Sequence, residues 1–288
     1  MRNLNYQLKQ ICKHWRDGSY VTQNNRERML TQIANELHGL GYHHMRANSL
    51  RPKHIEALVN HWQDKGIAIG TIKNRMAALR WWAEKINKQN VVARSNDHYG
   101  IPHRCFVTNE SKAKDLTQTQ LSQVKDEYVR ISLELQKAFG LRREEAIKFI
   151  PHYADKGDHI QLKGSWTKGG KPRTIPVRTE VQREILERAR SLAGLGSLIP
   201  SQRSYVNQLR VYVSYIRQAG LSQLHGLRHA YAQERYEELT GWKCPVTGGP
   251  DSKSLAPNLR KRDREARLTI SRELGHEREQ VTAVYLGR

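Results

Sequence analysis

Apolar residues recur every three or four positions in the first third of the chain, a spacing that predicts helices rather than strands. Polar turns separate the stretches that show it. The expected helices run from Leu4 to Trp15, from a cap at Thr22 to Leu40, from after Ser49 to Trp62, and from Gly70 to Ile86. Short turns between four helices favour a small orthogonal bundle.

The periodicity is lost between about residues 88 and 112, where Asn, Ser, Gly and Pro indicate a linker. We therefore predict one helical domain over residues 1–110, including most of this linker, and a second domain over residues 113–288. The second domain is expected to be mainly α. Its expected helices run from Gln118 to Phe139, Glu180 to Leu192, Gln202 to Gln218 and Leu259 to Arg267.

The second domain also contains a predicted hairpin. Two short β-rich runs, His159 to Leu162 and Thr174 to Val177, flank a Gly-Gly turn. The turn places Lys168 and Lys171 near the tip, where a lysine either reaches into a groove or simply makes the turn soluble. Farther along, the Gly- and Pro-rich stretch from Leu239 to Asn258 is expected to be a surface loop.

A short helix is expected near the end of the chain, from Arg278 to Val284. Val281 and Val284 are spaced to pack one face of that helix. The helix follows Leu274-Gly275-His276 and would deliver the phenol of Tyr285 to a defined place.

The charge of the chain points to a polyanionic partner. Lys and Arg number 49 against 28 Asp and Glu, which gives a net charge of +21. Both parts share the excess: residues 1–110 carry +9 and the remainder carries +12. Binding to phosphates is favoured because each neutralised phosphate releases counterions. An ordinary solvated basic surface and an anionic membrane surface are the alternatives, although no amphipathic lipid-seeking helix stands out.

Other classes of protein fit the composition less well. No stretch approaches the roughly 18 apolar residues that span a membrane, and no apolar run follows the N-terminal charge as in a signal peptide. The cysteines Cys12, Cys105 and Cys244 form no Cys-x-x-Cys pair, so neither a zinc site nor a disulfide framework is indicated. We expect a cytoplasmic protein without a metal or other cofactor.

Several basic residues are candidates for contacts with DNA. The fourth predicted helix has a basic side next to its apolar stripe, and the helix beginning at Leu259 is rich in arginine. Such faces either follow phosphates or are merely solvated, and the sequence does not decide between them. The candidates on these two helices are Lys73, Arg75, Arg80, Lys85, Arg260, Lys261 and Arg264.

Polar residues at a few other positions suggest chemistry, each weakly by itself. Arg142 follows a helix-breaking glycine and stands at a predicted helix start, where anions are also favoured. Glu145 is three residues on and can support that arginine, although such pairs are common. His225 and Arg228 share a helix face and offer a proton-transfer group and a two-pronged phosphate ligand.

Taken together and in order, these segments resemble the tyrosine recombinase, or phage integrase, family. The matching motifs are Gly-Leu-Arg-x-x-Glu, Lys-Gly-Gly-Lys-x-Arg-x-x-Pro, His-x-Leu-Arg-His, and Leu-Gly-His followed by a tyrosine nine residues after the histidine. The resemblance covers nearly the whole chain. It implies an N-terminal four-helix, SAM-like core-binding domain and a mixed α/β catalytic domain.

The resemblance also implies cleavage and rejoining of DNA. Tyr285 would attack the scissile phosphate, leaving a 3′-phosphotyrosine and a free 5′-hydroxyl, while Arg142 and Arg228 neutralise the developing charge. Because a protonated phenol is a poor nucleophile, its proton must pass to a neighbouring base or be displaced by local positive charge. The remaining roles implied are His225 as that base, Lys168 as the acid for the leaving oxygen, His276 as a hydrogen-bond donor, Glu145 as a support, and Lys171 and Arg173 as DNA contacts.

The partners implied are double-stranded DNA with a specific core site, further copies of the chain in a dimer or tetramer, and an accessory directionality factor. A mobile-element integrase associated with the nucleoid fits this picture best. No arm-binding domain precedes the helices, so we expect a simple inverted-repeat core site. Three residues follow Tyr285, so we expect the exchange between subunits to use another element or a movement of the helix that bears Tyr285. A DNA-binding protein of this fold without chemistry and a type IB topoisomerase are the alternatives.

Overall fold

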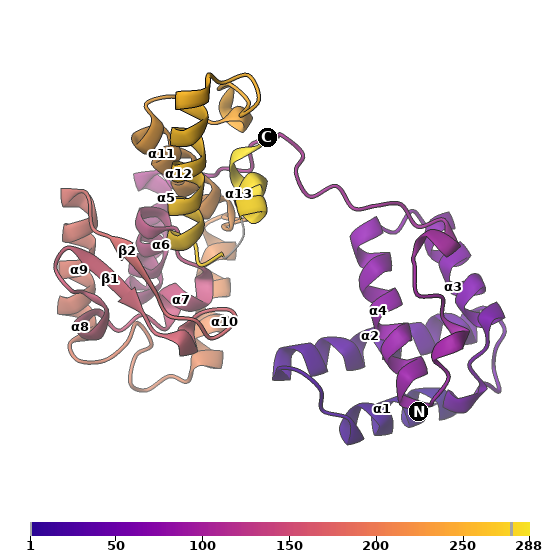
Figure 1. Ribbon diagram of the computed structural model, residues 1–288. Coiled ribbons are helices and arrows are strands. Elements are labelled where there is room, and N and C mark those ends of the chain that lie inside the picture. Colours follow the sequence, from indigo (N-terminus) through magenta and orange to yellow (C-terminus); the bar gives the residue numbers. More distant parts are fainter. Residues whose placement is uncertain (1, 277–278) are drawn as a thin grey trace. The chain divides into compact units, whose positions relative to one another are not determined.

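The computed structural model describes residues 2–276 and 279–288, and the chain forms two compact units, Met1–Cys105 and Phe106–Arg288 (Figure 1). The predicted fold class, mainly helical with a small β-hairpin, is confirmed. Within the described residues, every helix is too short or too polar to cross a membrane.

The N-terminal unit contains the four predicted helices: α1 (Asn3–His14), α2 (Tyr20–Gly39), α3 (Pro52–Asp64) and α4 (Ile69–Lys85). The start of α2 differs from the prediction. Ser19, not Thr22, caps the helix, because the Ser19 side chain accepts a hydrogen bond of 3.3 Å from the backbone N–H of Thr22. A serine at the N-cap satisfies a backbone donor that has no partner inside the helix.

The core of the N-terminal unit encloses an ion pair. Trp62 is fully buried and donates from its indole nitrogen to Glu36 at 2.7 Å. Arg75 pairs with the same carboxylate at 3.2 Å and is 6% exposed. The prediction that Arg75 belongs to an exposed basic face is therefore wrong: Arg75 is buried, and the partly buried Glu36 balances its charge, since a buried charge without a partner is costly.

Two other basic residues of α4 also bind groups of the same unit. Arg80 donates to the carbonyl of Ala93 at 3.0 Å and to the side chain of Asn96 at 2.7 Å. Lys85 pairs with Asp17 at 3.0 Å. Lys73 is partly exposed. The basic stripe of α4 thus serves mainly to hold this unit together.

The segment predicted as a linker is partly folded onto the N-terminal unit. It contains the short 3-10 helices η2 (Gln89–Val91) and η3 (Asp97–Tyr99). Val92 and Ile101 are buried in the core of this unit. The contacts of Arg80 with Ala93 and Asn96 explain why the chain stays packed beyond residue 88.

The C-terminal unit begins with two helices where one was predicted. The expected helix from Gln118 to Phe139 is divided into α5 (Gln118–Gln123) and α6 (Glu127–Phe139). Asp126 ends the continuity, because its carboxylate accepts a hydrogen bond of 3.0 Å from the N–H of Val129 and caps α6. The hydrophobic residues on both sides of the break share one core cluster with Tyr212 and Leu227.

The predicted hairpin is present. Strands β1 (His159–Leu162) and β2 (Arg173–Pro176) pair antiparallel, with Ile160 opposite Ile175 and both side chains buried. The connection includes the 3-10 helix η4 (Gly164–Trp166). The other helices here are α7 (Arg143–Ile147), α8 (Pro151–Ala154), α9 (Glu180–Ala193) and α10 (Tyr205–Gln218).

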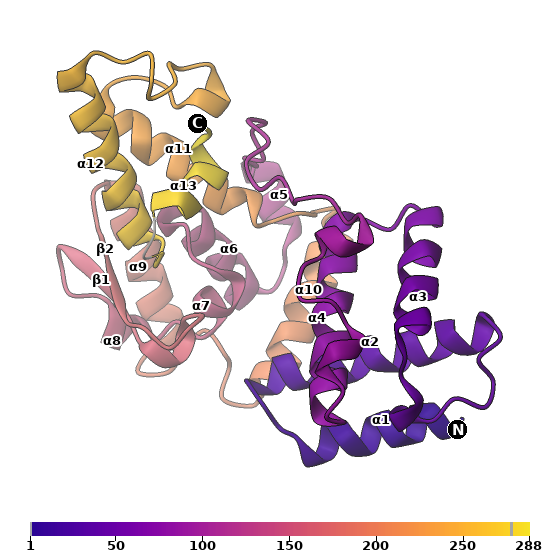
Figure 2. The same ribbon diagram turned by 45° about the vertical axis from the view of Figure 1, so that its right-hand side comes forward.

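The last helices pack together, as Figure 2 shows: α11 (Gly226–Thr240), α12 (Pro257–Glu273) and α13 (Glu279–Leu286). Helix α12 is longer than predicted at both ends. The stretch between α11 and α12 forms the 3-10 helix η5 (Pro245–Thr247) and buries Cys244.

The terminal helix was predicted from Arg278, which lies outside the described residues. Its packing face also differs from the prediction. Val281 is 38% exposed, whereas Thr282, Ala283, Tyr285 and Leu286 are buried. Val284 is half-buried.

The Glu36 ion pair gives a test of this packing. Replacing Glu36 with Gln leaves the buried charge of Arg75 unpaired, and we expect a loss of about 3 kcal/mol in the free energy of unfolding. Urea unfolding of the full chain, followed by tryptophan fluorescence, measures this loss. Glu84→Gln, which removes an exposed partner of Lys85, should cost less than about 1 kcal/mol. Equal effects of the two changes would contradict the assignment.

Candidate active site

Arg228 lies at the centre of the candidate site. It stands in the first turn of α11 and is 1% exposed. Its guanidinium donates to the carbonyl of Gly140 at 2.6 Å, where α6 ends, and to the carbonyl of Leu274, where α12 ends. Burial, followed by the charge of Arg142, lowers the pKa of Arg228 to about 10. The side chain therefore keeps its positive charge at neutral pH.

The phenol of Tyr285 lies against this guanidinium. Its oxygen is 3.4 Å from Nε of Arg228 and 3.4 Å from Nε2 of His225, and Tyr285 is 5% exposed. The backbone carbonyl of Tyr285 accepts a hydrogen bond of 3.1 Å from Gln233 on α11, which fixes the helix at this point. The terminal helix thus places the phenol beside both His225 and Arg228.

His276 completes the same cluster. It follows Gly275, whose φ of +66° lets the chain turn sharply after α12. Its Nε2 is 3.4 Å from Nη2 of Arg228, and its ring stacks on Tyr285 with centroids 5.6 Å apart. The turn of the Leu-Gly-His motif therefore brings the imidazole to the phenol and the guanidinium together.

A further histidine, His229, lies close to the phenol. The centroids of the His229 and Tyr285 rings are 4.5 Å apart. The motif His-x-Leu-Arg-His contained this residue, but we assigned it no role from the sequence. The sequence feature that could have indicated a role for His229 is its spacing of four residues from His225, which puts both rings on one helix face.

The histidines around the phenol have lowered pKa values. Burial, followed by the charges of Arg228 and Arg142, lowers the pKa of His225. Burial and then the charge of Arg228 lower the pKa of His276 to about 3. Burial and then His225 lower the pKa of His229 to about 4. Near neutral pH these imidazoles are uncharged, and each has a ring nitrogen that can accept a proton.

Arg142 and Glu145 form the supporting group expected from the sequence, but with a third member. Arg142 pairs with Glu145 at 2.8 Å through its guanidinium and donates its backbone N–H to the same carboxylate at 2.7 Å. Arg173 binds Glu145 with both arms, at 2.8 and 2.6 Å. The prediction that Arg173 contacts DNA is contradicted by its burial in the protein, where the ionised Glu145 needs it.

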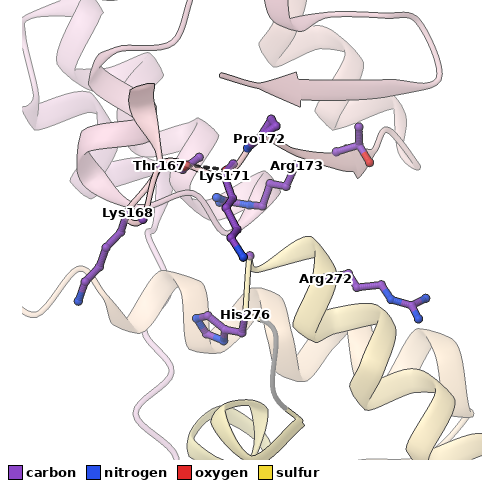
Figure 3. Close-up of a pocket in the computed structure, with 10 residues that line it drawn as sticks. Thr167, Lys168, Lys171, Pro172, Arg173, Arg272 and His276 are labelled. Atoms are coloured by element: carbon purple, nitrogen blue, oxygen red, sulfur yellow. Dashed lines mark hydrogen bonds between the residues drawn. The ribbon is translucent and has the colours of Figure 1, made fainter. Parts of the chain in front are cut away.

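The hairpin connection and the turn at His276 line one open cavity of about 510 Å³. Figure 3 shows the Lys171 side chain reaching toward the segment that carries His276, whereas the Lys168 side chain points in a different direction, at the left of the view. Lys168 is exposed, and no described contact joins it to Tyr285. Arg272 also lines the cavity, a basic residue that the sequence reading did not single out. The structure therefore brings Lys168 to the rim of the site rather than into its centre.

The basic residues of α12 lie on or near the surface. Lys261 and Arg264 are exposed. Arg260 is exposed as well but donates to the carbonyls of Leu255 and Lys253, at 2.7 and 2.6 Å. These side chains remain candidates for contacts with a polyanion.

Two protein-family models match the chain. The model of the family described as "Phage integrase, N-terminal" matches residues 1–92, and the model described as "Integrase" matches residues 104–234. No curated protein matches the sequence.

Solved structures of low sequence identity share the fold. A lambda integrase dimer bound to a COC′ core site is 16% identical, with 99% of this chain and 78% of that one covered and a TM-score of 0.62. The XerH site-specific recombinase bound to palindromic difH, in a post-cleavage complex, is 16% identical over 99% and 81% of the two chains, with a TM-score of 0.61. The Tn1549 transposon integrase in complex with circular intermediate DNA is 14% identical over 100% and 96%, with a TM-score of 0.57.

Both family models are integrase models, they follow one another along the sequence, and the fold agrees; the chain belongs to the phage integrase family of tyrosine recombinases.

Proposed function

We propose that the chain is a site-specific recombinase that cuts and rejoins DNA through a covalent bond between Tyr285 and a 3′-phosphate. The observation that carries this proposal is the position of the Tyr285 oxygen, 3.4 Å from both the Arg228 guanidinium and the His225 imidazole. A nucleophile beside a proton acceptor and a phosphate ligand is what phosphoryl transfer to a side chain requires.

In the proposed first step, the Tyr285 oxygen forms a bond to phosphorus and the bond to the 5′-oxygen breaks. The phenol proton passes to His225, whose lowered pKa keeps it in the accepting form. Arg142 and Arg228 neutralise charge on the non-bridging oxygens, where it increases in the transition state. His276 hydrogen-bonds the same phosphate from the turn after α12. Lys168 gives a proton to the leaving 5′-oxygen, after moving inward from its exposed position.

The second step reverses the first with a different strand. A 5′-hydroxyl attacks the phosphotyrosine, the P–O bond to Tyr285 breaks, and the phenol regains its proton. The covalent bond conserves the energy of the phosphodiester, so rejoining consumes no nucleotide cofactor.

We infer the binding partners of the chain from its net positive charge and from the proteins of similar structure. We infer that the N-terminal unit is the core-type DNA-binding domain and the C-terminal unit the catalytic domain. One similar protein is a dimer on a core site, and another is bound to a circular intermediate of a transposon. We therefore propose that this chain acts as a dimer or tetramer on an inverted-repeat core site of a mobile element, with an accessory directionality factor and in association with the nucleoid.

Lys73, Lys171, Lys261 and Arg264 are the phosphate contacts that we propose for the two units, with Arg260 beside them on α12. Each is exposed or partly exposed. Arg80 and Lys85 are weaker candidates because their charged groups bind within the N-terminal unit.

Replacing Tyr285 with Phe tests the nucleophile directly. On a nicked suicide duplex carrying the core site, the wild-type protein should form a covalent adduct at the 3′ side, and Tyr285→Phe should form none because the phenol oxygen is missing. Denaturing electrophoresis detects the adduct, and a gel shift measures binding, which we expect to persist. Binding without an adduct from the wild-type protein would favour a silent DNA-binding protein. Relaxation of any supercoiled plasmid would favour a topoisomerase.

Replacing Arg142 with Gln separates catalysis from binding. We expect the single-turnover rate of adduct formation to fall roughly 100-fold, because one ligand of the transition-state charge is lost. DNA affinity should change by less than about fivefold. Arg142 is the better test because Arg228 also holds buried carbonyls. Arg130→Gln, which removes a charge of α6 paired with Glu127, is the matched control and should keep both properties. Equal losses of rate and affinity in Arg142→Gln would mean that Arg142 merely holds DNA.

The pH dependence of cleavage tests His225 as the base. An ordinary histidine has a pKa of about 6.5, and the pKa of His225 lies below its usual value. His225 therefore stays unprotonated as the pH falls toward that value, and the cleavage rate should begin to fall only below it. The rate at subsaturating DNA reports groups of the free protein. His225→Gln should lower the rate and remove this acid limb. An acid limb centred above pH 6.5 would contradict the assignment.

A further inference from the structure

Arg173 occupies an unusual position for a basic residue of a DNA-binding protein. Each of its guanidinium nitrogens donates to a protein oxygen. Nη1 and Nη2 bind the two oxygens of Glu145 at 2.8 and 2.6 Å. Nε donates to the carbonyl of Glu273 at 2.8 Å, at the last residue of α12. The side chain thus links the start of β2, helix α7 and the end of α12.

Glu145 is 0% exposed and accepts from both Arg173 and Arg142. Burial raises the pKa of this carboxyl, but the hydrogen bond and charge of Arg173 and then the charge of Arg142 lower it to about 2. Glu145 is therefore an anion in the interior. A buried carboxylate attracts the nearest cation strongly, because the surrounding dielectric is low.

The charges of the three residues explain why the second arginine matters. Arg142, Glu145 and Arg173 sum to one positive charge. Without Arg173 the sum is zero, because Glu145 cancels Arg142. A neutral Arg142–Glu145 pair would attract phosphate weakly, and the carboxylate would compete with the phosphate for the guanidinium of Arg142.

We propose that Arg173 is a positioning residue that neutralises Glu145 and so leaves the positive charge of Arg142 for the DNA phosphate. This role rests on the proposed function and extends it to a residue that touches no reacting atom. Arg173 acts on Arg142 through the shared carboxylate.

The same side chain also supports the turn that carries His276. A Cβ on Gly275 would lie 3.0 Å from Cδ of Arg173 and 3.1 Å from its Nη1, so the turn passes directly over this side chain. Lys168 and Lys171 lie on the connection that ends at Arg173, and both line the cavity next to His276 (Figure 3). Arg173 therefore connects the hairpin to Glu145, which also binds Arg142, and to the turn that carries His276.

The test uses charge rather than loss of contacts. The variants are Arg173→Gln, Glu145→Gln, the double variant of both, and Arg173→Lys, which keeps the charge with one prong. The net charge of the side chains at positions 142, 145 and 173 is zero in Arg173→Gln and +2 in Glu145→Gln. In the double variant it is +1, as in the wild type. Double-variant comparisons isolate such coupling between neighbours.

One measurement is the single-turnover rate of adduct formation at saturating DNA. We expect Arg173→Gln to lose roughly 100-fold, with DNA affinity changed less than about fivefold. The double variant should recover at least about tenfold of that loss, because Glu145 no longer cancels Arg142. Arg173→Lys should lie between Arg173→Gln and the wild type. Arg188→Gln, which removes an exposed Arg–Glu pair with Glu134, is the control and should behave as the wild type.

The second measurement does not depend on cleavage. Titration with inorganic phosphate, followed by the NMR shifts of the His276 and His225 rings, gives the anion affinity of the site. The expected order of affinity is Glu145→Gln at least equal to the wild type, the double variant near the wild type, and Arg173→Gln weaker by about tenfold or more.

The outcomes separate the two proposals. If the wild type forms no adduct but phosphate affinity follows the charge order, the recombinase chemistry fails and the role of Arg173 stands. If the folded double variant is no better than Arg173→Gln in either measurement, Arg173 only holds the structure and the inference is overturned. Circular dichroism and the thermal midpoint establish that each variant is folded under the assay conditions.

Discussion

The buried guanidinium of Arg228 has to find acceptors inside the protein, and these acceptors position the rest of the site. An unpaired charge in a protein interior costs several kcal/mol or more. Arg228 binds the carbonyls of Gly140 and Leu274, which stand at the ends of α6 and α12. Carbonyls at helix ends lack partners within their helix and carry the negative end of its dipole. The start of α11 is thereby tied to the ends of two other helices.

This choice of partners preserves the positive charge. The described partners of Arg228 are two carbonyls, the Tyr285 hydroxyl and a ring nitrogen of His276, and none of them is a carboxylate, so no acidic side chain cancels the charge of the guanidinium. Arg142 is different, because Glu145 would cancel it if Arg173 did not neutralise that carboxylate. Two routes therefore give the same result, an arginine that is held by the protein in surroundings that keep a net positive charge.

The positive charges of Arg228 and Arg142 also affect the pKa values of the nearby histidines. Burial and the neighbouring arginines lower the pKa values of His225 and His276, so both imidazoles are uncharged near neutral pH. The same charge distribution thus keeps both imidazoles in the neutral form, in which a ring nitrogen can accept a proton.

The sequence predicted much of this site, because the motifs kept their order and spacing over a long stretch of chain. The helices of both units and the hairpin followed from periodicity and turn residues. The roles of Arg75 and Arg173 could not be predicted. Each pairs with a carboxylate far away in sequence, Glu36 and Glu145 respectively, and local patterns show a basic residue but not its distant partner. The break at Asp126 was missed because a cap inside an amphipathic stretch barely disturbs its periodicity.

The glycines of the motifs explain why the motifs belong together. Gly140 has a φ of +60°, and a Cβ there would lie 2.7 Å from the ring of Tyr231 on α11. Gly275 has a φ of +66° and lies against Arg173. Both glycines lie at the ends of helices whose last carbonyls accept hydrogen bonds from Arg228. The Gly-Leu-Arg and Leu-Gly-His motifs therefore both position acceptors for the arginine of the His-x-Leu-Arg motif. A side chain at Gly140 would clash with Tyr231, and one at Gly275 would press on Arg173, so each glycine is needed where its segment leads to Arg142 or His276.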